Sequence, residues 1–318
     1  MNQLNVRVTA KTKETNDIYC LELAAVDGKP LPPFSAGSHV DILIKEGLVR
    51  QYSLCNDPSE QHRYQIGVLR DPHSRGGSIA VHDGIHEGDI IQISEPKNHF
   101  AMVPAKRTLL FAGGIGVTPI LCMAERLAAT GAPFEMHYCA RSEDHAAFRS
   151  RITRSAFADR VHFHFDNGPE QQKMDLPALL AAPEADTHLY VCGPGGFIDF
   201  VVNTASAAGW DAAHVHLEYF GAQALDTSQD GAFDIQIASS GKVLRIPADK
   251  SVTAVLAEHG IEVPVSCEQG VCGTCVTRVL SGTPEHRDLY FTADEQAGND
   301  QFTPCCSRSK SPCLVLDL

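Results

Sequence analysis

The sequence has no stretch of about eighteen consecutive apolar residues and no run of basic residues. The first absence argues against a membrane-spanning helix, because such a helix needs about 20 predominantly apolar residues. The second, together with a formal net charge of −13, argues against binding to nucleic acid or to an anionic membrane. Residues 1–8 also lack the apolar core of a signal peptide and alternate like a β-strand. We therefore expect a cytoplasmic protein whose partners include neither a membrane nor nucleic acid.

The chain also lacks the residue patterns of common hydrolases. It shows no paired carboxylates, no Ser–His–Asp order and no zinc-type histidine cluster. Of its 11 cysteines, four near the C-terminus belong to one spaced motif and the other seven are scattered. Several of the scattered thiols fall in apolar strand or helix patterns: Cys20, Cys122, Cys139 and Cys192. This cysteine usage is typical of a reducing compartment rather than of a disulfide framework.

Four cysteines share the spacing C-x4-C-x2-C-x29-C: Cys267, Cys272, Cys275 and Cys305. This is the ligand pattern of a plant-type 2Fe–2S cluster, which moves electrons one at a time. Gly270 and Gly273 allow tight turns that can point backbone amides at sulfide. Cys306 is an alternative fourth ligand that lengthens the last spacing by one residue. A zinc site is the other alternative, but zinc favours two CxxC-like pairs and only one is present.

Three different residue patterns follow one another along the chain. Residues 1–103 show short alternating apolar segments broken by Gly, Pro and Asp, which predicts an antiparallel β-barrel. Residues 104–224 alternate strand and helix patterns, which predicts an α/β domain with a parallel sheet. Residues 225–232 have linker composition, and 233–318 have the outline of a β-grasp ferredoxin, with Ser251 capping a helix at 252–259. The fold class expected is a multidomain α+β protein.

The expected α/β domain has a specific succession of elements. Its strands are expected at 108–112, 134–140, 161–165, 189–192 and 214–219. Its helices are expected at 119–129, 146–155 and 196–208, with Pro119 as the first helical residue.

Two glycine-rich turns in this domain each follow a strand and lead into a helix. The first is Gly-Gly-Ile-Gly-Val-Thr-Pro at 113–119, and the second is Cys-Gly-Pro-Gly at 192–195. Small residues at such a turn let backbone amides and the positive end of a helix approach a pyrophosphate. Neither turn is the spaced G-x-G-x-x-G fingerprint, and a single one is equally typical of a tight turn. Two of them at the carboxyl edge of one sheet outline a dinucleotide crevice.

Three further side chains at that edge have a functional and a structural interpretation. Cys192 is placed to touch a nicotinamide, or is a packed thiol. Arg141 follows a strand and is placed to meet a phosphate or adenine, or is a solvated strand end. Asp166 can accept hydrogen bonds from ribose hydroxyls and repel a 2′-phosphate, which favours NADH over NADPH, or it is a turn residue before Asn-Gly.

The first domain carries a set of residues that fits a flavin. Arg50 offers a cation for phosphate, Tyr52 an aromatic face for stacking, and residues 74–78, Ser-Arg-Gly-Gly-Ser, a loop with free amide donors. Taken singly these signals are weak, since an aromatic residue at strand spacing is more often a packing residue.

With these motifs together, the chain resembles the phthalate dioxygenase reductase family over essentially all 318 residues. The resemblance includes Arg-x-Tyr-Ser at 50–53, Ser-Arg-Gly-Gly-Ser at 74–78, and the two glycine-rich turns. It also includes Glu-Tyr-Phe at 218–220, the nine-residue segment 267–275, and Pro-Cys-Cys-Ser-Arg-Ser at 304–309. The order flavin barrel, nucleotide domain, ferredoxin is specific to this group. In the family the last ligand precedes x-Ser-Arg, which selects Cys305.

The resemblance implies sites for both FMN and the pyridine nucleotide. FMN contacts are implied for Arg50, Tyr52, Ser53, Val68, Leu69, Gly76, Gly77, Ser78, Thr118 and Phe220. Nucleotide contacts are implied for Gly114, Ile115, Gly116, Val117, Thr118, Pro119, Arg141, Asp166, Cys192, Gly193, Pro194 and Gly195. Leu69 departs from the basic residue of some relatives, so only a backbone contact is implied there. Phe220 is expected to cover the flavin and to yield to the nicotinamide.

The implied activity is an NADH-dependent reductase that passes electrons through FMN and the 2Fe–2S cluster to a Rieske-type aromatic oxygenase or O-demethylase. An alternative is a stand-alone NADH reductase of ferric ions, quinones or dyes. A rival from another class is a redox-sensing binding protein, but the chain has neither a DNA-binding helix pair nor a basic face.

Overall fold

A computed structural model describes residues 3–45, 48–72, 76–221 and 230–318. The chain divides into two compact units, Met1–Phe220 and Gly221–Leu318. No helix within the described residues is long and apolar enough to cross a membrane.

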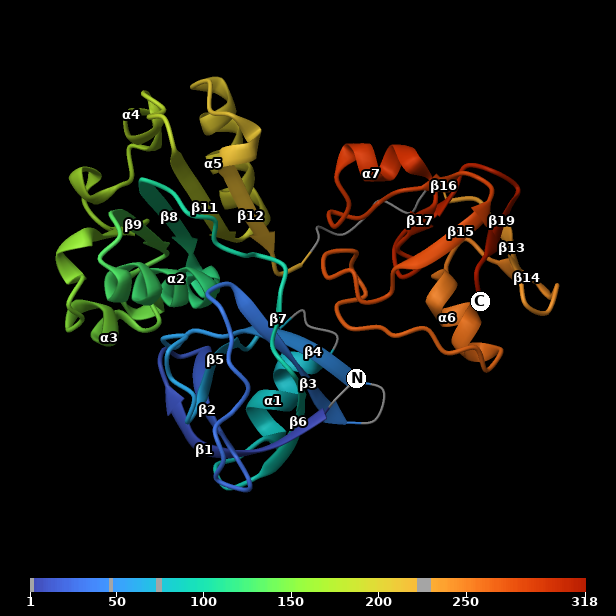
Figure 1. Cartoon of the computed structure of the whole chain (residues 1–318), viewed down its shortest axis with the longest axis horizontal. Coiled ribbons are helices and arrows are strands. Elements are labelled where there is room, and N and C mark those ends of the chain that lie inside the picture. Colours follow the sequence, from blue (N-terminus) through green and yellow to red (C-terminus); the bar gives the residue numbers. More distant parts are fainter. Residues whose placement is uncertain (1–2, 46–47, 73–75, 222–229) are drawn as a thin grey trace. The chain divides into compact units, whose positions relative to one another are not determined.

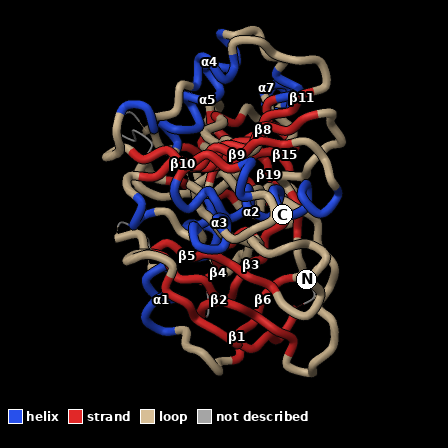
Figure 2. The backbone as a smooth tube through the Cα atoms, turned by 90° about the vertical axis from the view of Figure 1, so that its left-hand side faces the viewer, coloured by secondary structure: helices blue, strands red, loops and turns tan. Residues whose placement is uncertain are grey.

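The N-terminal part of the first unit is a nearly closed antiparallel barrel. Its strands are β1 (Gln3–Lys13), β2 (Ile18–Ala25), β3 (Ser38–Lys45), β4 (Leu48–Ser53), β5 (Tyr64–Leu69), β6 (Ile90–Ser94) and β7 (Lys97–Asn98). They pair in the order β4-β3-β6-β1-β2-β5, with β7 on β3, and a bridge between Leu54 and Ile66 joins the two edges. Alternate side chains such as Val6, Val8 and Ile42 are fully buried inside, as period-2 patterning requires. Figure 2 shows these strands together with helix α1 (Gly77–Gly84) beside them.

The rest of the first unit is a parallel α/β domain. Its strands are β8 (Arg107–Gly113), β9 (Phe134–Ala140), β10 (Val161–Phe165), β11 (Thr187–Gly193) and β12 (Val215–Tyr219), in the order β10-β9-β8-β11-β12. Its helices are α2 (Val117–Thr130), α3 (Arg149–Thr153), α4 (Leu176–Leu180) and α5 (Gly195–Ala207). Leu110 of β8 packs with α2 on one side of the sheet, and Leu109 and Phe111 pack with α4 and α5 on the other. Figure 1 shows these helices around the sheet. The α2-side core also contains barrel residues such as Ile18 and Phe100, so barrel and sheet form one compact unit.

The second unit is a small mixed sheet with a helix packed on it. Its strands are β13 (Phe233–Ile237), β14 (Val243–Ile246), β15 (Thr277–Ser281), β17 (Gln301–Phe302) and β19 (Cys313–Leu316), in the order β14-β13-β19-β15-β17. A second pair is β16 (Pro284–Glu285) with β18 (Arg308–Ser309), and the helices are α6 (Val252–Glu258) and α7 (Ala293–Gly298). As predicted, Ser251 caps α6: its hydroxyl accepts a hydrogen bond from the Ala254 amide at 3.2 Å. Val252, Val255 and Leu256 of α6 enter the core.

The predicted fold class is confirmed, and two helix boundaries in the α/β domain are corrected. Pro119 is the third residue of α2 rather than the first, because a short 3-10 turn at Gly114–Gly116 leads into the helix earlier. The helix predicted at 146–155 shortens to α3. Phe148 there has φ of 60°, in the left-handed region, which an α-helix cannot include.

Candidate functional site

The two glycine-rich turns lie next to each other at the carboxyl edge of the parallel sheet. β8 and β11 are hydrogen-bonded neighbours, with Ala112 paired to Cys192. Gly114, Ile115 and Gly116 form the turn that leads from β8 into α2, which begins at Val117. On β11, Gly193 ends the strand, Pro194 precedes α5, and Gly195 begins that helix. The ends of two helices therefore meet at one place on the sheet edge, as the sequence pattern predicted.

Glycine is required in these turns because backbone packs against backbone. A Cβ atom on Gly116 would lie 2.2 Å from the carbonyl oxygen of Cys192. A Cβ on Gly193 would lie 2.9 Å from the Cα atom of Gly113. Gly114 has φ of 53°, a conformation that other residues rarely adopt. The start of α2 can sit directly on the end of β11 only because these side chains are missing.

Arg141 and Asp166 lie together on the β9–β10 side of the same edge. Arg141 directly follows β9 and Asp166 directly follows β10. The Asp166 amide donates to Ala140 O at 3.1 Å, and the Asn167 amide donates to Arg141 O at 3.2 Å. Both side chains are exposed. The geometry therefore offers a cation and a carboxylate to a ligand bound across the sheet edge.

Cys192, which is buried, and Glu218, which has one buried carboxylate oxygen, lie on neighbouring strands. They face each other in the register of β11 and β12. Burial raises the pKa of the Cys192 thiol well above its ordinary value, and the Glu218 carboxyl raises it further. Cys192 is therefore a neutral thiol at physiological pH.

Glu218 was not singled out as a site residue from the sequence. Its Oε2 atom is buried without a hydrogen-bond partner among the described residues. Burial raises the pKa of Glu218 to about 8, against a smaller opposing effect of a hydrogen bond with the Ser53 side chain. The only sequence signal was an acidic residue within a strand that otherwise reads as core. Glu218 thus links the nucleotide sheet to β4 of the barrel.

The barrel places its candidate residues on β4, on β5 and at the start of α1. Arg50, Tyr52 and Ser53 lie on β4, and Val68 and Leu69 end β5. Tyr52 is half-buried, and burial raises the pKa of its hydroxyl. The β4–β5 edges are joined by the Leu54–Ile66 bridge, so these residues share one end of the barrel.

The start of α1 lies directly against Arg50. Gly76 has φ of 84° and precedes the helix, and a Cβ on Gly77 would lie 2.6 Å from Arg50 Nε. The Ser78 hydroxyl accepts a hydrogen bond from the Asp71 amide at 3.1 Å. Ser74 and Arg75, the first part of the predicted loop, lie outside the described residues. A guanidinium beside a helix N-terminus is an arrangement suited to an anion.

Thr118 and Phe220 differ in how they approach this end of the barrel. Thr118 is 1% exposed, and its methyl group fills the space over Gly67 of β5, where a Cβ would lie 2.7 Å away. Its hydroxyl donates to Ile115 O at 3.1 Å. Phe220 follows β12, and 39% of it is exposed. The first is a packing contact between α2 and the barrel, and the second is an aromatic surface residue.

In the second unit the four predicted ligands form two pairs of thiols. The Cys267 and Cys272 sulfurs are hydrogen-bonded to each other, and so are those of Cys275 and Cys305. The hydrogen bond from Cys267 lowers the pKa of Cys272 to about 5. Backbone amides also point at sulfur: the Gln269 amide donates to Cys267 Sγ at 3.3 Å.

Two pairs of thiols are a ligand set that suits a diiron cluster, because such a cluster needs two ligands on each iron. Each pair also lies beside backbone amide donors. Within the described residues, no group of three or more His, Cys, Asp or Glu side chains is placed to hold a metal ion. Cys306, the alternative ligand, instead lies 3.3 Å from the Thr303 hydroxyl, although its thiol also reaches Cys305.

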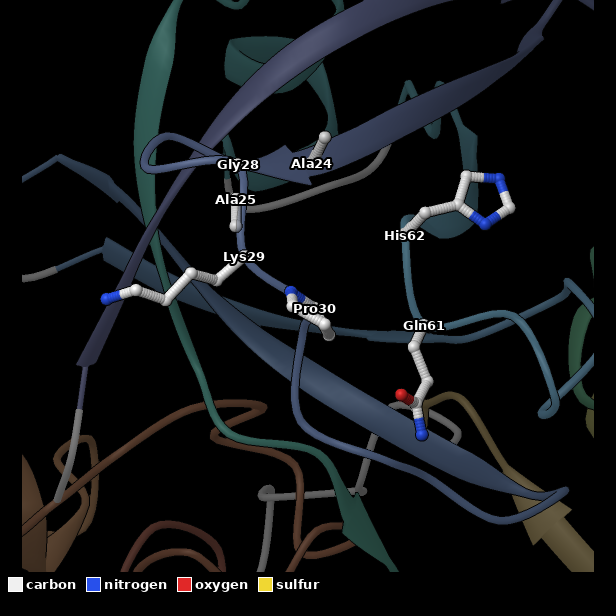
Figure 3. Close-up of a pocket in the computed structure, with 7 residues that line it drawn as sticks. All are labelled: Ala24, Ala25, Gly28, Lys29, Pro30, Gln61 and His62. Carbon is white, nitrogen blue, oxygen red and sulfur yellow. The ribbon is translucent and has the colours of Figure 1, made fainter.

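A surface pocket of about 380 Å³ on the barrel contains none of these residues. It is open and lies near the end of β2 (Figure 3), lined by Ala24, Ala25, Gly28, Lys29, Pro30, Gln61 and His62.

Comparison with known families and structures agrees with this arrangement. Residues 235–310 match the model of the 2Fe-2S iron-sulfur cluster binding domain, and residues 96–215 match the N-terminal domain of dimethylamine monooxygenase subunit DmmA-like proteins. The chain is 59% identical to a vanillate O-demethylase oxidoreductase of Pseudomonas putida over 98% of both chains. It is 38% identical to a phthalate dioxygenase reductase of Burkholderia cepacia over 99% of this chain and 97% of the other.

Among solved structures, a phthalate dioxygenase reductase matches with a TM-score of 0.79 and 38% identity, covering 100% of this chain and 98% of the other. That structure is described as modular, for electron transfer from pyridine nucleotides to a 2Fe–2S centre. An intact type IV self-sufficient cytochrome P450 monooxygenase matches with a TM-score of 0.84 and 36% identity, over 99% of this chain but 41% of the other.

Proposed function

Because the chain belongs to the phthalate dioxygenase reductase family, we propose that it passes electrons from NADH through FMN and a 2Fe–2S cluster to a Rieske-type aromatic oxygenase or O-demethylase. As in the rest of the family, it is an oxidoreductase that uses a pyridine nucleotide, a flavin and a 2Fe–2S cluster. The family expected from the sequence is confirmed. The observation that carries the proposal is the set of four thiols in two pairs, in a chain that also has a nucleotide-type sheet edge.

In this proposal FMN binds at the β4–β5 end of the barrel. Arg50 and the amides at Gly76, Gly77 and Ser78 hold the phosphate, because a guanidinium there adjoins the start of α1. Tyr52 offers its ring, and Ser53, Val68 and Leu69 offer backbone groups. Thr118 and Phe220 approach from the α/β domain.

The pyridine nucleotide binds across the carboxyl edge of the parallel sheet. Gly114, Ile115, Gly116 and Val117 cradle the pyrophosphate with the first turn of α2, and Cys192, Gly193 and Pro194 lie against the nicotinamide. Arg141 and Asp166 bind the adenosine half. Asp166 selects NADH, since an exposed carboxylate repels a 2′-phosphate. As a neutral thiol, Cys192 contributes shape rather than nucleophilic chemistry.

Cys267, Cys272, Cys275 and Cys305 are the proposed cluster ligands. When bound, the two cofactors supply hydride acceptance and single-electron transfer, and the chain supplies binding, orientation and access. The proposed domains are the FMN barrel at 1–103, the nucleotide domain at 104–224, a linker at 225–232 and the ferredoxin domain at 233–318. The proposed location is the cytoplasm. The similarity to reductases of vanillate O-demethylase and phthalate dioxygenase supports a partner oxygenase of that kind.

The test uses the purified chain and a purified Rieske oxygenase. The chain should contain flavin and iron, reduce cytochrome c with NADH, and be required for substrate turnover by the oxygenase. Apo-protein that takes up no flavin on reconstitution would overturn the proposal. Cytochrome c reduction without any support of oxygenase turnover would instead favour a stand-alone reductase. Negligible NADH oxidation with every acceptor would favour a redox sensor.

A further inference from the structure

A buried carboxylate, Asp288, connects the two stretches of chain that carry the proposed cluster ligands. Its side chain is 0% exposed, yet within the described part of the chain its hydrogen bonds come from a histidine, two hydroxyls and a backbone amide rather than from Lys or Arg. The neighbouring Arg287 guanidinium is turned to Asp230 and Glu285 instead. A carboxylate buried without a strong cation is costly unless hydrogen bonds compensate. The positions of those donors therefore show what Asp288 is built to hold.

The donors come from both sides of Cys305. Asp288 Oδ1 accepts from the Thr303 hydroxyl at 3.3 Å and from the Ser307 hydroxyl at 3.4 Å. Each donor lies two residues from Cys305, one before it and one after it. The two hydroxyl oxygens are also 2.9 Å from each other, so both lie against the same carboxylate oxygen. One carboxylate oxygen thus fixes the turn that presents the fourth thiol.

The same residue is in contact with the three-cysteine loop. The Leu289 amide donates to Gly270 O at 3.0 Å. A Cβ on Gly270 would meet Cys306 Sγ first and would lie 3.0 Å from both Cα and Cβ of Asp288, so the loop backbone packs against both residues. Asp288 Oδ2 accepts from the Phe291 amide at 2.9 Å, and the His286 Nδ1 atom lies 3.3 Å from Oδ1. These bonds fix the turn that holds Asp288 against Gly270.

We propose that Asp288 is a positioning residue for the cluster: it sets the place of Cys305 relative to the other three thiols and lowers the reduction potential of the centre. The proposal rests on the proposed function, since it takes these cysteines as ligands. The geometric effect follows from the network that joins Gly270 to residues 303–307. The electrostatic effect follows because reduction adds negative charge, which a buried carboxylate nearby disfavours in a low dielectric.

The decisive variant is Asp288→Asn, which removes the charge and keeps the shape. Asp294→Asn is the matched control, because it removes an exposed carboxylate of the same segment, whose charge is screened by solvent. The measurements on full-length holoprotein are an EPR-monitored redox titration, the g values, iron content, and the half-life of the cluster in a chelator. We expect a higher midpoint potential, altered g values and a shorter half-life for Asp288→Asn alone.

A second variant, Thr303→Val, tests the tether separately from the charge. It deletes one hydroxyl donor, so the half-life should shorten while the potential shifts less than in Asp288→Asn. Asp288→Asn could also lose all of its iron. If its near-UV circular dichroism then matches that of a Cys272→Ser variant, which lacks one proposed ligand, the loss supports a positioning role for Asp288. If Asp288→Asn does not fold, an unchanged half-life in Thr303→Val overturns the proposal. It is equally overturned if Asp288→Asn matches Asp294→Asn in every readout. A wild-type chain without iron or an EPR signal would instead contradict the proposed function itself.

Discussion

The sheet edge of the first unit and the cysteine loop of the second are two of the proposed binding sites, and different kinds of contact hold them in place. At the sheet edge, Gly113, Gly116 and Gly193 bring backbone onto backbone, and regular strands and helices do the positioning. Residues 266–276 of the cysteine loop include no helix or strand. That loop depends on amide-to-sulfur bonds and on the buried network of Asp288.

This difference determines which substitutions each place can tolerate. An edge built on main-chain contacts is sensitive to any added side chain but depends little on single hydrogen bonds. A loop built on side-chain and sulfur contacts depends on each of them, and its folding is coupled to its metal. Substitutions in the cysteine loop and at the sheet edge should therefore differ in how large their effects are and in which cofactor they affect.

The largest effect is expected from Cys272→Ser, which separates the two sites. It should abolish the cluster absorbance and EPR signal, because a hydroxyl does not replace the thiolate on iron. Reduction of the flavin by NADH should persist, since the barrel and the sheet share a core that does not include this loop. Stopped-flow flavin reduction and iron analysis check this. Loss of flavin reduction as well would show that the two units are not independent, and Cys313→Ser is the control at a thiol outside the loop.

The strand-end residues of the sheet edge could be predicted from sequence because the physics there is local. Arg141, Asp166 and Cys192 each follow or end a segment with strand patterning, and parallel strands bring such positions to one edge. The cysteine spacing was as informative, since few other ligand sets use it.

Other features could not be predicted because they depend on tertiary contacts. Glu218 is placed against Cys192 and Ser53 only by the register of β12 and the docking of the barrel. Asp288 lies 13 residues beyond Cys275, in a segment with no periodic pattern. Asp230 fell in the predicted linker at 225–232, yet its side chain is 3% exposed and bound to Arg287. No local propensity marks any of these three carboxylates.

The next largest effect is expected from Gly116→Ala at the sheet edge. The new methyl group would lie 2.2 Å from Cys192 O, so α2 must move away from β11. Overpacking of this kind costs about 1–3 kcal/mol of unfolding free energy. The KM for NADH should rise about tenfold, since a small displacement of bound groups has large effects. Gly196→Ala is the control, because a Cβ there meets nothing within 4 Å. Equal thermal stability and NADH kinetics in both variants would contradict the packing argument.

A smaller effect is expected from Asp166→Ala, which tests a side chain of the same edge rather than its backbone. Removing the carboxylate takes away a charged hydrogen bond worth about 1.5–3 kcal/mol. The ratio of kcat/KM for NADH over NADPH should therefore fall by about 10- to 100-fold. Asp159→Ala, at an exposed position nearby in the sequence, should leave the ratio unchanged. An unchanged ratio in Asp166→Ala would show that Asp166 does not select the nucleotide and is a turn residue.

The smallest effect on cofactor binding is expected from Glu218→Gln, which should instead change how the stability of the chain depends on pH. Burial raises the pKa of Glu218 to about 8 in the folded chain, above the ordinary value of 4.5 for this carboxyl. Between these two values the folded state binds more protons than the unfolded state, so the free energy of unfolding should fall as pH rises. Glutamine does not titrate, and the variant should lose this part of the slope.

Denaturant unfolding of the two chains at intervals from pH 5 to about 8.5 measures the difference. Other titrating groups change the free energy of unfolding with pH in the same way in both chains. Only the difference in unfolding free energy between the two chains therefore reports on Glu218. That difference should change sharply through pH 5 to 8 and level off above it, since the folded carboxyl is then ionised too. If the free energies of unfolding of the two chains change in parallel with pH, Glu218 is ionised in the folded state. In that case its buried Oε2 atom must be solvated, and the sheet edge would be wetter at β12 than its backbone packing suggests.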